Sequence, residues 1–557
     1  MSVERVRAAY RRIAEVDRPE IWITLRPEDD VAAEAAAVDP ALPLAGLLVA
    51  VKDNIDVAGL PTTAACPAFA YEPAGTAPAI ARLVKAGAVV LGKTNLDQFA
   101  TGLVGTRSPY GAVRDAWRPD RVSGGSSSGS AVAVALGIAD IGAGTDTAGS
   151  GRVPAAFAGI VGVKPTRGVV PNRGSVPACR TLDCITTLAR DLATASHAAA
   201  VMAGLDHRDP TWRAWPSDAP LAAPPQPRVG VPAVDGLPGM TSEATRAFAA
   251  AADRLAAAGA ELVDLDAAPF LEAGRLLYDG AFVAERHAAV GAFVDAHPDE
   301  VDPAVGAIIS AAGRIAARDL VADGERLAHL RLRAEEQFAR VDAILLPTTT
   351  AQPTIAEVAA DPMGVNARLG TFTNCANLLE LCAVAVPAGE ADGGRFGVTV
   401  LAPAFADRVV AGVAGLLLDE EPASDGLGPD GVELLVVGAH RSGQPLNPEL
   451  SSRGARLRGV VWTAPEYRLH ALRTTPPKPG LVRVPDGGVP IEGELWELPR
   501  TGLGDFLAAL PAPMALGRAK LDDGREVVGF TCEAAALRGA PDISEHGSWI
   551  AYLRAMV

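Results

Sequence analysis

The stretch that says most about the fold runs from Arg121 to Gly168 and reads RVSGGSSSGSAVAVALGIADIGAGTDTAGSGRVPAAFAGIVGVKPTRG. Two turns rich in small residues flank the apolar run VAVALGIADIGAG. An apolar run of this length is expected to be buried, so the glycines and serines do not form a flexible linker. A phosphate-binding loop is not indicated either, because this stretch does not contain the GxxxxGK[ST] pattern.

The two turns can carry chemistry. Gly124 and Gly125 allow backbone conformations that other residues avoid, and the serines that follow can be aimed precisely. In the second turn, from Thr145 to Gly151, Ser150 follows the backbone amides of Thr147, Ala148 and Gly149. Amides that converge on one point in a tight turn stabilise an oxyanion. The residue types alone leave catalysis and a structural role about equally supported.

Outside this stretch, buried strand-like runs alternate with alanine-rich helical segments, as in GLLVAVKDNIDV, PAIARLVKAG and AGAVVLGKTNLDQF. This alternation predicts an α/β fold. The first forty residues are predicted to be helical, with Val6, Tyr10, Ile13 and Val16 on one face. A helix is expected to begin at Thr241, which can cap it, and the helical pattern continues to about Arg340. VDAILLPTT then predicts a strand.

The composition changes after residue 418. Residues 419–431 are acidic and contain proline and glycine without periodicity, which is typical of a linker. Strand-like runs follow in 432–557: VELLVVGA, YRLHAL, LVRVP, GELWELP and REVVGFTCE. We therefore predict one domain over 1–418, a linker over 419–431 and a second, small α+β domain over 432–557.

The composition excludes several classes of protein. The chain has 557 residues, with 50 Lys and Arg against 66 Asp and Glu and a formal charge of -16, which argues against a nucleic-acid partner. It has no apolar run long enough for a membrane span, and residues 1–20 lack the apolar core of a secretion signal. Its six cysteines include no CxxC pair, so no metal site is expected. We expect a cytoplasmic protein that needs no cofactor.

The stretch RVSGGSSSGS…GTDTAGSGR resembles the signature of the amidase signature family, and AVKDN upstream resembles the segment that holds the lysine of that family. The resemblance covers about residues 40–415. It implies a mixed central sheet covered by helices, and a triad formed by Lys52, Ser126 and Ser150, in which the peptide bond before Ser126 is cis.

In the mechanism that this resemblance implies, Ser150 attacks an amide carbonyl, and Ser126 relays its proton to Lys52. The lysine must be uncharged, which requires burial. The oxyanion is expected to bind the amides of Thr147, Ala148, Gly149 and Ser150. Lys93 is interpreted as a structural neighbour of the triad, and so are Asp146 and Arg152 beside the nucleophile.

The similarity is closest to the allophanate hydrolases, a branch of the family. SVPACRTLDC, LLYDGAFVAERHAAV and TNCANLLELCAVAVPAG are among the segments that carry it. It implies that Tyr278 and Arg286, eight residues apart on one expected helix, bind the carboxylate of allophanate, which is urea-1-carboxylate. A guanidinium can hold a carboxylate through two parallel hydrogen bonds, and a phenol can add a third.

The segments LLVVGAHRSGQPLNPEL, KPGLVRVPDGG and GFTCEAAALRGAPDIS resemble the appended domain of the allophanate hydrolases, which is itself similar to γ-glutamyl cyclotransferase-like folds. The resemblance implies that this domain helps to decarboxylate N-carboxycarbamate, the product of the amidase domain. His440 is the candidate catalytic residue, and Glu494 is an alternative acidic candidate.

Three alternatives remain open at this point. The chain could be an amidase for another small amide, an amidotransferase subunit that acts on charged transfer RNA, or a scaffold that retained the fold without activity. The acidic charge and the appended domain argue against the second, and the joint presence of Lys52, Ser126 and Ser150 argues against the third. A homodimer is expected from the family resemblance alone.

Overall fold

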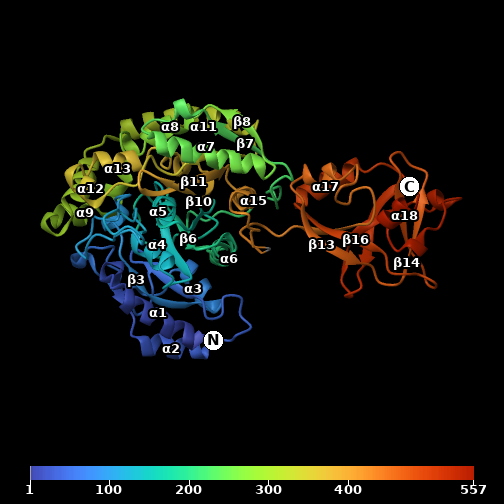
Figure 1. Cartoon of the computed structure of the whole chain (residues 1–557), viewed down its shortest axis with the longest axis horizontal. Coiled ribbons are helices and arrows are strands. Elements are labelled where there is room, and N and C mark those ends of the chain that lie inside the picture. The colour runs from blue at the N-terminus through green and yellow to red at the C-terminus, as the bar shows by residue number, and fades with distance from the viewer. Residues whose placement is uncertain (1, 424, 557) are drawn as a thin grey trace. The chain divides into compact units, whose positions relative to one another are not determined.

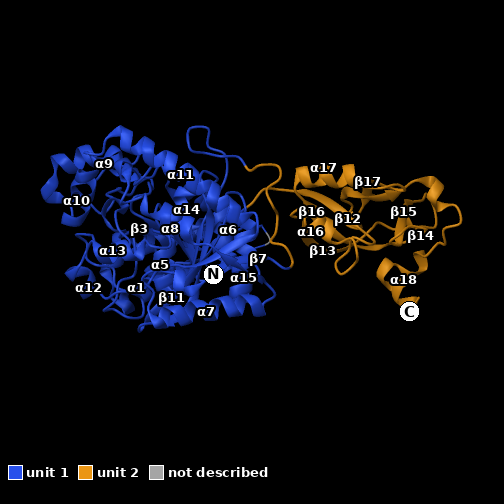
Figure 2. Ribbon diagram, turned by 90° about the horizontal axis from the view of Figure 1, so that it is seen from above, with its two compact units in different colours: residues 1–214, 226–427 blue, residues 215–225, 428–557 orange. Residues whose placement is uncertain are grey.

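The computed structural model describes residues 2–423 and 425–556, and the chain divides into two compact units (Figure 2). Unit 1 comprises Met1–Ala214 and Gln226–Leu427, and unit 2 comprises Trp215–Pro225 and Gly428–Val557. The division after Leu427 falls within the expected linker 419–431, of which residue 424 lies outside the described residues. Residues 215–225 also belong to unit 2, although they lie inside the predicted first domain 1–418, and there the Leu221 amide donates to the Gly454 carbonyl at 2.9 Å.

Unit 1 is built on an eleven-stranded mixed sheet, which confirms the predicted α/β class (Figure 1). In spatial order its strands are β1 (Trp22–Leu25), β3 (Val89–Thr94), β2 (Leu48–Lys52), β4 (Ile141–Asp146), β6 (Cys184–Ala189), β5 (Val161–Lys164), β10 (Cys382–Ala391), β11 (Gly394–Ala402), β9 (Ala343–Pro347), β7 (Arg228–Pro232) and β8 (Glu261–Leu265). Every residue of β2, β3 and β4 is buried, because helices and loops cover both faces there.

The helices of unit 1 are α1 (Ser2–Val16), α2 (Glu28–Ala37), α3 (Pro78–Lys85), α4 (Ser128–Ala135), α5 (Arg152–Ala158), α6 (Leu192–Met202), α7 (Ser242–Ala257), α8 (Ala268–Arg275), α9 (Ala284–Ala296), α10 (Pro303–Ala312), α11 (Ala317–Phe338), α12 (Ile355–Ala360), α13 (Gly364–Leu369), α14 (Cys375–Leu378) and α15 (Asp407–Leu418). The buried helices α4 and α5 contact each other and the central strands. A second group, α6, α7 and α15, also packs on the sheet. The two small-residue turns that flank the apolar run therefore lead into α4 and α5.

Two parts of the expected helical pattern are wrong. The first forty residues do not form continuous helix, because α1 ends before Asp17, which has a φ of 46°, and β1 follows with its β-branched Ile23 and Thr24. Between 241 and 340, Gly259 with a φ of 102° ends the helical segment, and β8 follows. The expected start is confirmed, since the Thr241 side chain accepts a hydrogen bond from the Ala244 amide.

Unit 2 has a five-stranded sheet and a two-stranded one. The first contains, in order, β13 (Arg456–Trp462), β16 (Glu492–Leu498), β12 (Val432–Val436), β18 (Glu526–Cys532) and β17 (Met514–Lys520), and the second pairs β14 (Tyr467–Leu472) with β15 (Lys478–Arg483). Its helices are α16 (Pro448–Ser451), α17 (Arg500–Ala509) and α18 (Trp549–Ala555). All five strand-like runs of the sequence therefore form strands. The likeness to γ-glutamyl cyclotransferase-like folds stays a prediction.

Among the helices of residues 2–423 and 425–556, none is long and apolar enough to cross a bilayer.

Candidate active site

Lys52 is the last residue of β2 and lies completely buried beside two hydroxyl groups. Its Nζ is 2.7 Å from the Oγ of Ser126 and 2.7 Å from the Oγ1 of Thr145. Thr145 lies on β4, which pairs with β2 in parallel, so the two neighbouring strands bring the amine and a hydroxyl to the same edge. The structure thus brings Lys52 and Ser126 together, and it adds Thr145 as a second hydroxyl partner, which no motif in the sequence indicated.

Burial changes the acidity of this amine. The pKa of Lys52 is lowered to about 7, chiefly because the charged form loses its hydration, whereas the nearby carboxylates of Asp97, Asp146 and Asp183 act in the opposite direction. The positive charge of Arg286 lowers the pKa further. A substantial fraction of the lysine is therefore uncharged near neutral pH and can accept a proton.

The peptide bond between Gly125 and Ser126 is cis. The two preceding glycines are required by close packing. A Cβ added to Gly125 would lie 2.0 Å from the Oδ2 of Asp97, and one added to Gly124, which has a φ of 74°, would lie 3.0 Å from Pro154. Asp97 is itself held in place, because it accepts hydrogen bonds from the amides of Gly105 and Arg107, each at 3.0 Å. The turn therefore has little freedom to move Ser126 away from Lys52.

Ser150 lies in the turn between β4 and α5 and is 2% exposed. Its carbonyl accepts a hydrogen bond from the Ser127 amide at 3.1 Å, which joins the two turns directly. The Ser127 hydroxyl in turn donates to the Thr145 carbonyl at 3.1 Å. The backbone that carries Ser126 and the backbone that carries Ser150 are thus bonded to each other.

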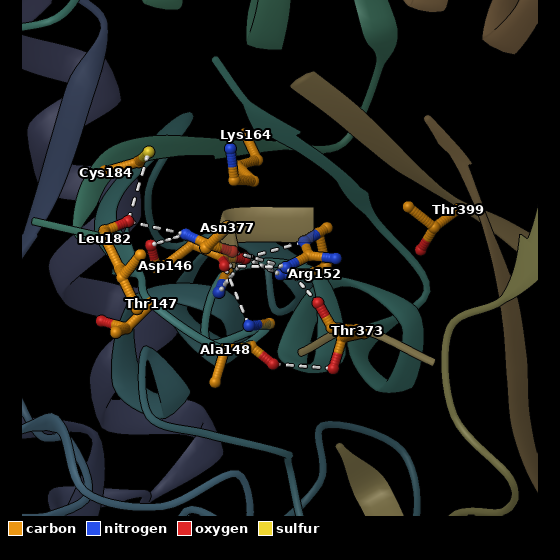
Figure 3. A network of polar contacts seen from close by, with 12 residues as sticks. Asp146, Thr147, Ala148, Arg152, Lys164, Leu182, Cys184, Thr373, Asn377 and Thr399 are labelled. Carbon is orange, nitrogen blue, oxygen red and sulfur yellow. Dashed lines mark hydrogen bonds and ion pairs between the residues drawn. The ribbon is translucent and has the colours of Figure 1, made fainter. Parts of the chain in front are cut away.

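A network of polar contacts supports the turn that carries Ser150 (Figure 3). Arg152 forms a buried ion pair with Asp146, with Nη2 and Oδ1 2.9 Å apart. The Asp146 carboxylate also accepts from the Gly151 amide at 3.1 Å. Asn377 donates to the Asp146 carbonyl at 2.8 Å, and Thr373 donates to the Ala148 carbonyl at 2.7 Å. Asp146 and Arg152 therefore hold the turn through hydrogen bonds and an ion pair, in agreement with the structural role predicted for them.

The expected oxyanion site needs a correction at Gly149. Its amide donates to the Oδ1 of Asp146 at 2.9 Å, so this donor is already engaged by the carboxylate. In the described part of the chain, the amides of Thr147, Ala148 and Ser150 donate to no protein acceptor. A glycine is nevertheless required at position 149. Its φ is 113°, and a Cβ there would lie 2.4 Å from the Thr373 Oγ1.

Lys93 is paired differently from Lys52. Its Nζ lies 3.1 Å from the Oδ1 of Asp53, and both side chains are fully buried. It also donates to the Thr62 hydroxyl at 3.2 Å. Residues 87–94, GAVVLGKT, match the GxxxxGK[ST] pattern, but Val89–Thr94 form strand β3, whose amides bond to neighbouring strands and cannot surround a phosphate. The contacts of Lys93 with Asp53 and Thr62 are those of a buried structural ion pair, which is consistent with the structural role expected for this lysine.

Tyr278 and Arg286 are in contact, but they do not share one helix. Tyr278 lies in the turn after α8, and Arg286 lies in α9. The Nη2 of Arg286 donates to the Tyr278 hydroxyl at 2.8 Å. Gly280 lies close to Leu276 and Asp323, and the chain turns there before α9 begins. The two residues meet because the chain folds back, not because of helical spacing.

Arg286 is 1% exposed, and its Nη1 donates to the Thr101 hydroxyl at 2.8 Å. Its Nε is buried and donates to no acceptor in the described part of the chain. Among residues 2–423 and 425–556, no carboxylate forms an ion pair with this guanidinium, although Asp183 lies near enough to act on it electrostatically. Thr101 carried no signal in the sequence, because it comes from a loop that only the tertiary fold brings to α9.

In unit 2, His440 is buried between two aromatic rings. It stacks on Phe530 with ring centroids 5.0 Å apart and meets Phe506 edge-on at 5.2 Å. Its Nε2 lies 3.0 Å from the Oε2 of Glu449. Burial lowers the pKa of His440, and Glu449 partly opposes that change. Glu449 was not singled out from the sequence.

Glu494 is also buried, but it is engaged by several donors. Its Oε2 accepts from the Ser442 amide at 2.8 Å and from the Trp496 indole at 3.0 Å. Arg441 lies 3.5 Å from its other oxygen. This carboxylate holds the turn after His440 in place, whereas His440 lines a small pocket with Lys478, Met514 and Phe530.

Fold and site together define a class of hydrolase, and comparison with known proteins agrees. Residues 4–410 match the model of the amidase family, and the chain belongs to that family. Within it, the chain has the two-part organisation of the allophanate hydrolases, because residues 432–554 match the model of the allophanate hydrolase C-terminal domain.

The chain is 40% identical to the urea amidolyase of Lachancea kluyveri over 569 residues and to that of Saccharomyces cerevisiae over 543 residues. These alignments cover 96% and 92% of this chain but 31% and 30% of the relatives, so the chain spans about a third of their length. The solved structure of the Kluyveromyces lactis allophanate hydrolase superposes with a TM-score of 0.89 at 36% identity and covers 100% of this chain and 97% of that one.

Proposed function

We propose that the protein hydrolyses allophanate to ammonia and carbon dioxide in two steps, one in each unit. The observation that carries the substrate assignment is Arg286, a buried guanidinium that contacts Tyr278 and retains an unpartnered Nε. A buried cation without a carboxylate partner favours an anionic ligand, and allophanate combines a carboxylate with an amide.

In the first step, the Ser150 hydroxyl attacks the amide carbonyl of allophanate. Ser126, held 2.7 Å from the Lys52 amine, passes the proton to that amine, and the same relay protonates the departing ammonia. The free amides of Thr147, Ala148 and Ser150 are the proposed donors to the oxyanion. Water then hydrolyses the acyl-enzyme and releases N-carboxycarbamate.

The substrate orientation follows from the position of Arg286. This cation acts electrostatically on Lys52. Asp183 interacts electrostatically with both Lys52 and Arg286, and it accepts a hydrogen bond from Thr147 in the turn that carries Ser150. A carboxylate on Arg286 and Tyr278 leaves the other end of a small substrate for the turn that carries Ser150. Substrates without the carboxylate lose this contact, which gives the selectivity for allophanate.

In the second step, we assign the decarboxylation of N-carboxycarbamate to unit 2, with His440 as the catalytic residue. Its neutral form is favoured by burial, and Glu449 fixes one ring nitrogen. Glu494 is assigned to positioning, because four neighbouring groups already engage it. The carbamate that results breaks down to ammonia and carbon dioxide.

The test is ammonia release from allophanate by the full chain and by its Ser150→Ala variant. Loss of the nucleophile is expected to lower kcat by about 10⁴-fold or more. Ser128→Ala is the matched control, because the Ser128 hydroxyl makes only a 3.3 Å contact with the Asn95 carbonyl. Faster turnover of a neutral amide than of allophanate would favour the alternative, an amidase for another small amide.

A cytoplasmic location and a homodimer complete the proposal. All six cysteines are free thiols, as expected for a protein of a reducing compartment. The homodimer rests on family resemblance, and light scattering during size-exclusion chromatography would test it.

A further inference from the structure

The guanidinium of Arg286 contacts a loop formed by residues 97–107. Its Nη1 donates to the Thr101 hydroxyl at 2.8 Å and to the Ala100 carbonyl at 3.3 Å. Since Nη1 carries two hydrogens, each of them has an acceptor. The Thr101 hydroxyl donates its own hydrogen to the Phe99 carbonyl at 3.2 Å, so it acts as an acceptor toward Arg286. Thr101 is 1% exposed, and water does not compete for this contact.

The other two nitrogens of Arg286 are less fully engaged. Nη2 also carries two hydrogens and donates to the Tyr278 hydroxyl at 2.8 Å. Nε is buried and has no acceptor among residues 2–423 and 425–556. Nε and Nη2 form the side edge of a guanidinium, which can hold a carboxylate through two parallel hydrogen bonds. The loop therefore engages one end of Arg286 and leaves the side edge for a ligand.

The loop has a constrained backbone at this contact. Phe99 and Ala100 have φ values of 52° and 53°, in the left-handed region that residues with a side chain rarely occupy. Arg107, which is 3% exposed, donates from its Nη1 to the Thr101 carbonyl at 2.9 Å. Thr101 is thus held through its carbonyl by Arg107, while its hydroxyl contacts Arg286.

The same loop packs against the turn that carries Ser126. A Cβ on Gly125 would lie 2.0 Å from the Oδ2 of Asp97, so these two residues are in close contact. Asp97 and Thr101 are four positions apart in the chain. One short segment therefore contacts both the turn of the proposed triad and the guanidinium that we assign to the substrate.

We propose that Thr101 is a positioning residue for the recognition of allophanate: it engages Nη1 of Arg286, so that the edge formed by Nε and Nη2 faces the substrate carboxylate. This inference rests on the proposed function, which assigns Arg286 to that carboxylate. Without the Thr101 hydroxyl, Nη1 loses an acceptor, and the guanidinium can turn away from the orientation that binds the substrate. Because Thr101 does not touch the reacting atoms, its loss should affect binding more than chemistry.

The experiment measures ammonia release from allophanate by full-length variants. Thr101→Val removes the hydroxyl and keeps the branched shape, so KM should rise about tenfold, while kcat should change by less than about threefold. Thr101→Ser restores the hydroxyl and should return KM to within about threefold of the wild type. The matched control is Thr187→Val, because Thr187 is also buried and its hydroxyl donates to the Ala195 carbonyl at 2.9 Å. We expect this control to keep the wild-type KM.

Two further measurements separate positioning from general damage to the fold. Labelling of Ser150 by a neutral fluorophosphonate requires the nucleophile but no carboxylate site, so Thr101→Val should be labelled at the wild-type rate. In the Arg286→Gln background, Thr101→Val should raise KM by less than a further factor of about two, because the two residues act through one contact.

Four results would overturn the inference: an unchanged KM in Thr101→Val, a Thr101→Ser variant as impaired as Thr101→Val, labelling that slows together with kcat/KM, or additive effects in the double variant. If circular dichroism shows that Thr101→Val is unfolded, Thr101→Ala, which only removes atoms, is judged by the same criteria. Failure of the proposed function is distinct. The wild type would then not hydrolyse allophanate, or Arg286→Gln would keep the wild-type KM.

Discussion

The amine of Lys52 and the hydroxyl of Ser126 are 2.7 Å apart, although 74 residues separate them in the chain. Each is held by its own element, the lysine by the end of β2 and the serine by the turn before α4. The pairing of Lys52 with Thr94 of β3 and the packing of Gly125 against Asp97 hold the backbones of the two residues in place. The pair is therefore preorganised for proton transfer before any substrate binds.

Ammonia release should depend on pH through Lys52. Burial lowers the pKa of this amine to about 7, and only the uncharged amine accepts the proton. Because protonation removes the base, kcat/KM should fall about tenfold per pH unit below the pKa and reach a plateau above it. The measurement is the pH profile of ammonia release from allophanate, and a flat profile across neutral pH would contradict the role of the amine.

Replacing Arg286 should weaken substrate binding more than it slows chemistry. Arg286→Gln removes the buried cation that we assign to the carboxylate of allophanate, so KM should rise by about 100-fold or more, with a smaller effect on kcat. Tyr278→Phe removes one hydrogen bond and should raise KM by about tenfold. The control is Arg275→Gln, an exposed arginine at the end of α8. An unchanged KM in Arg286→Gln would remove the specificity argument and leave the amidase assignment intact.

The ion pair between Asp146 and Arg152 should matter for stability. Burial acts to raise the pKa of Asp146, but Arg152 holds it below its ordinary value. Asp146→Ala leaves the buried guanidinium unpaired and should lower the free energy of unfolding by about 3–5 kcal/mol. Glu272→Ala, which removes the half-exposed partner of Arg333, should cost less than about 1 kcal/mol.

Chemical denaturation of both variants, with m-values compared, provides the measurement. The lowered pKa of Asp146 also determines how the stability of the protein changes with pH. Because the folded pKa of Asp146 is lowered, its contribution to stability is present above the unfolded pKa and is lost as the pH falls through the folded one. If Asp146→Ala and Glu272→Ala lower the free energy of unfolding equally, the buried ion pair is not important for the stability of the fold.

Gly149→Ala should disturb catalysis through geometry. The new Cβ would meet Thr373 at 2.4 Å and would require a φ of 113°, which residues with a side chain rarely adopt. Since Thr373 also anchors the Ala148 carbonyl, the turn that carries Ser150 must shift, and kcat should fall by about 100-fold. Gly236→Ala, where a Cβ meets nothing within 4 Å, is the control for ammonia release. Activity equal to that of the control would show that the turn tolerates displacement.

Several features could be predicted from the sequence because they depend on local chemistry. The small-residue turns required glycine at 124 and 125, and the apolar run between them required burial. The strand runs of unit 2 and the cap at Thr241 are likewise local patterns. In contrast, β1 and β8 are short strands inside segments with helical periodicity, and their strand pairing, a non-local interaction, decides their conformation.

The sequence by itself determined which residue types are available. They are the lysine of the segment AVKDN, the serines of the two small-residue turns, and a tyrosine eight residues before an arginine. Only the tertiary structure decided their environment. Burial, and not spacing, lowers the pKa of Lys52, and the turn after α8 brings Tyr278 to Arg286. The carboxylate of Asp146 engages the Gly149 amide. The physical reason is that charge and hydrogen bonding depend on which distant groups and how much water surround an atom, and the chain sets both only when it is folded.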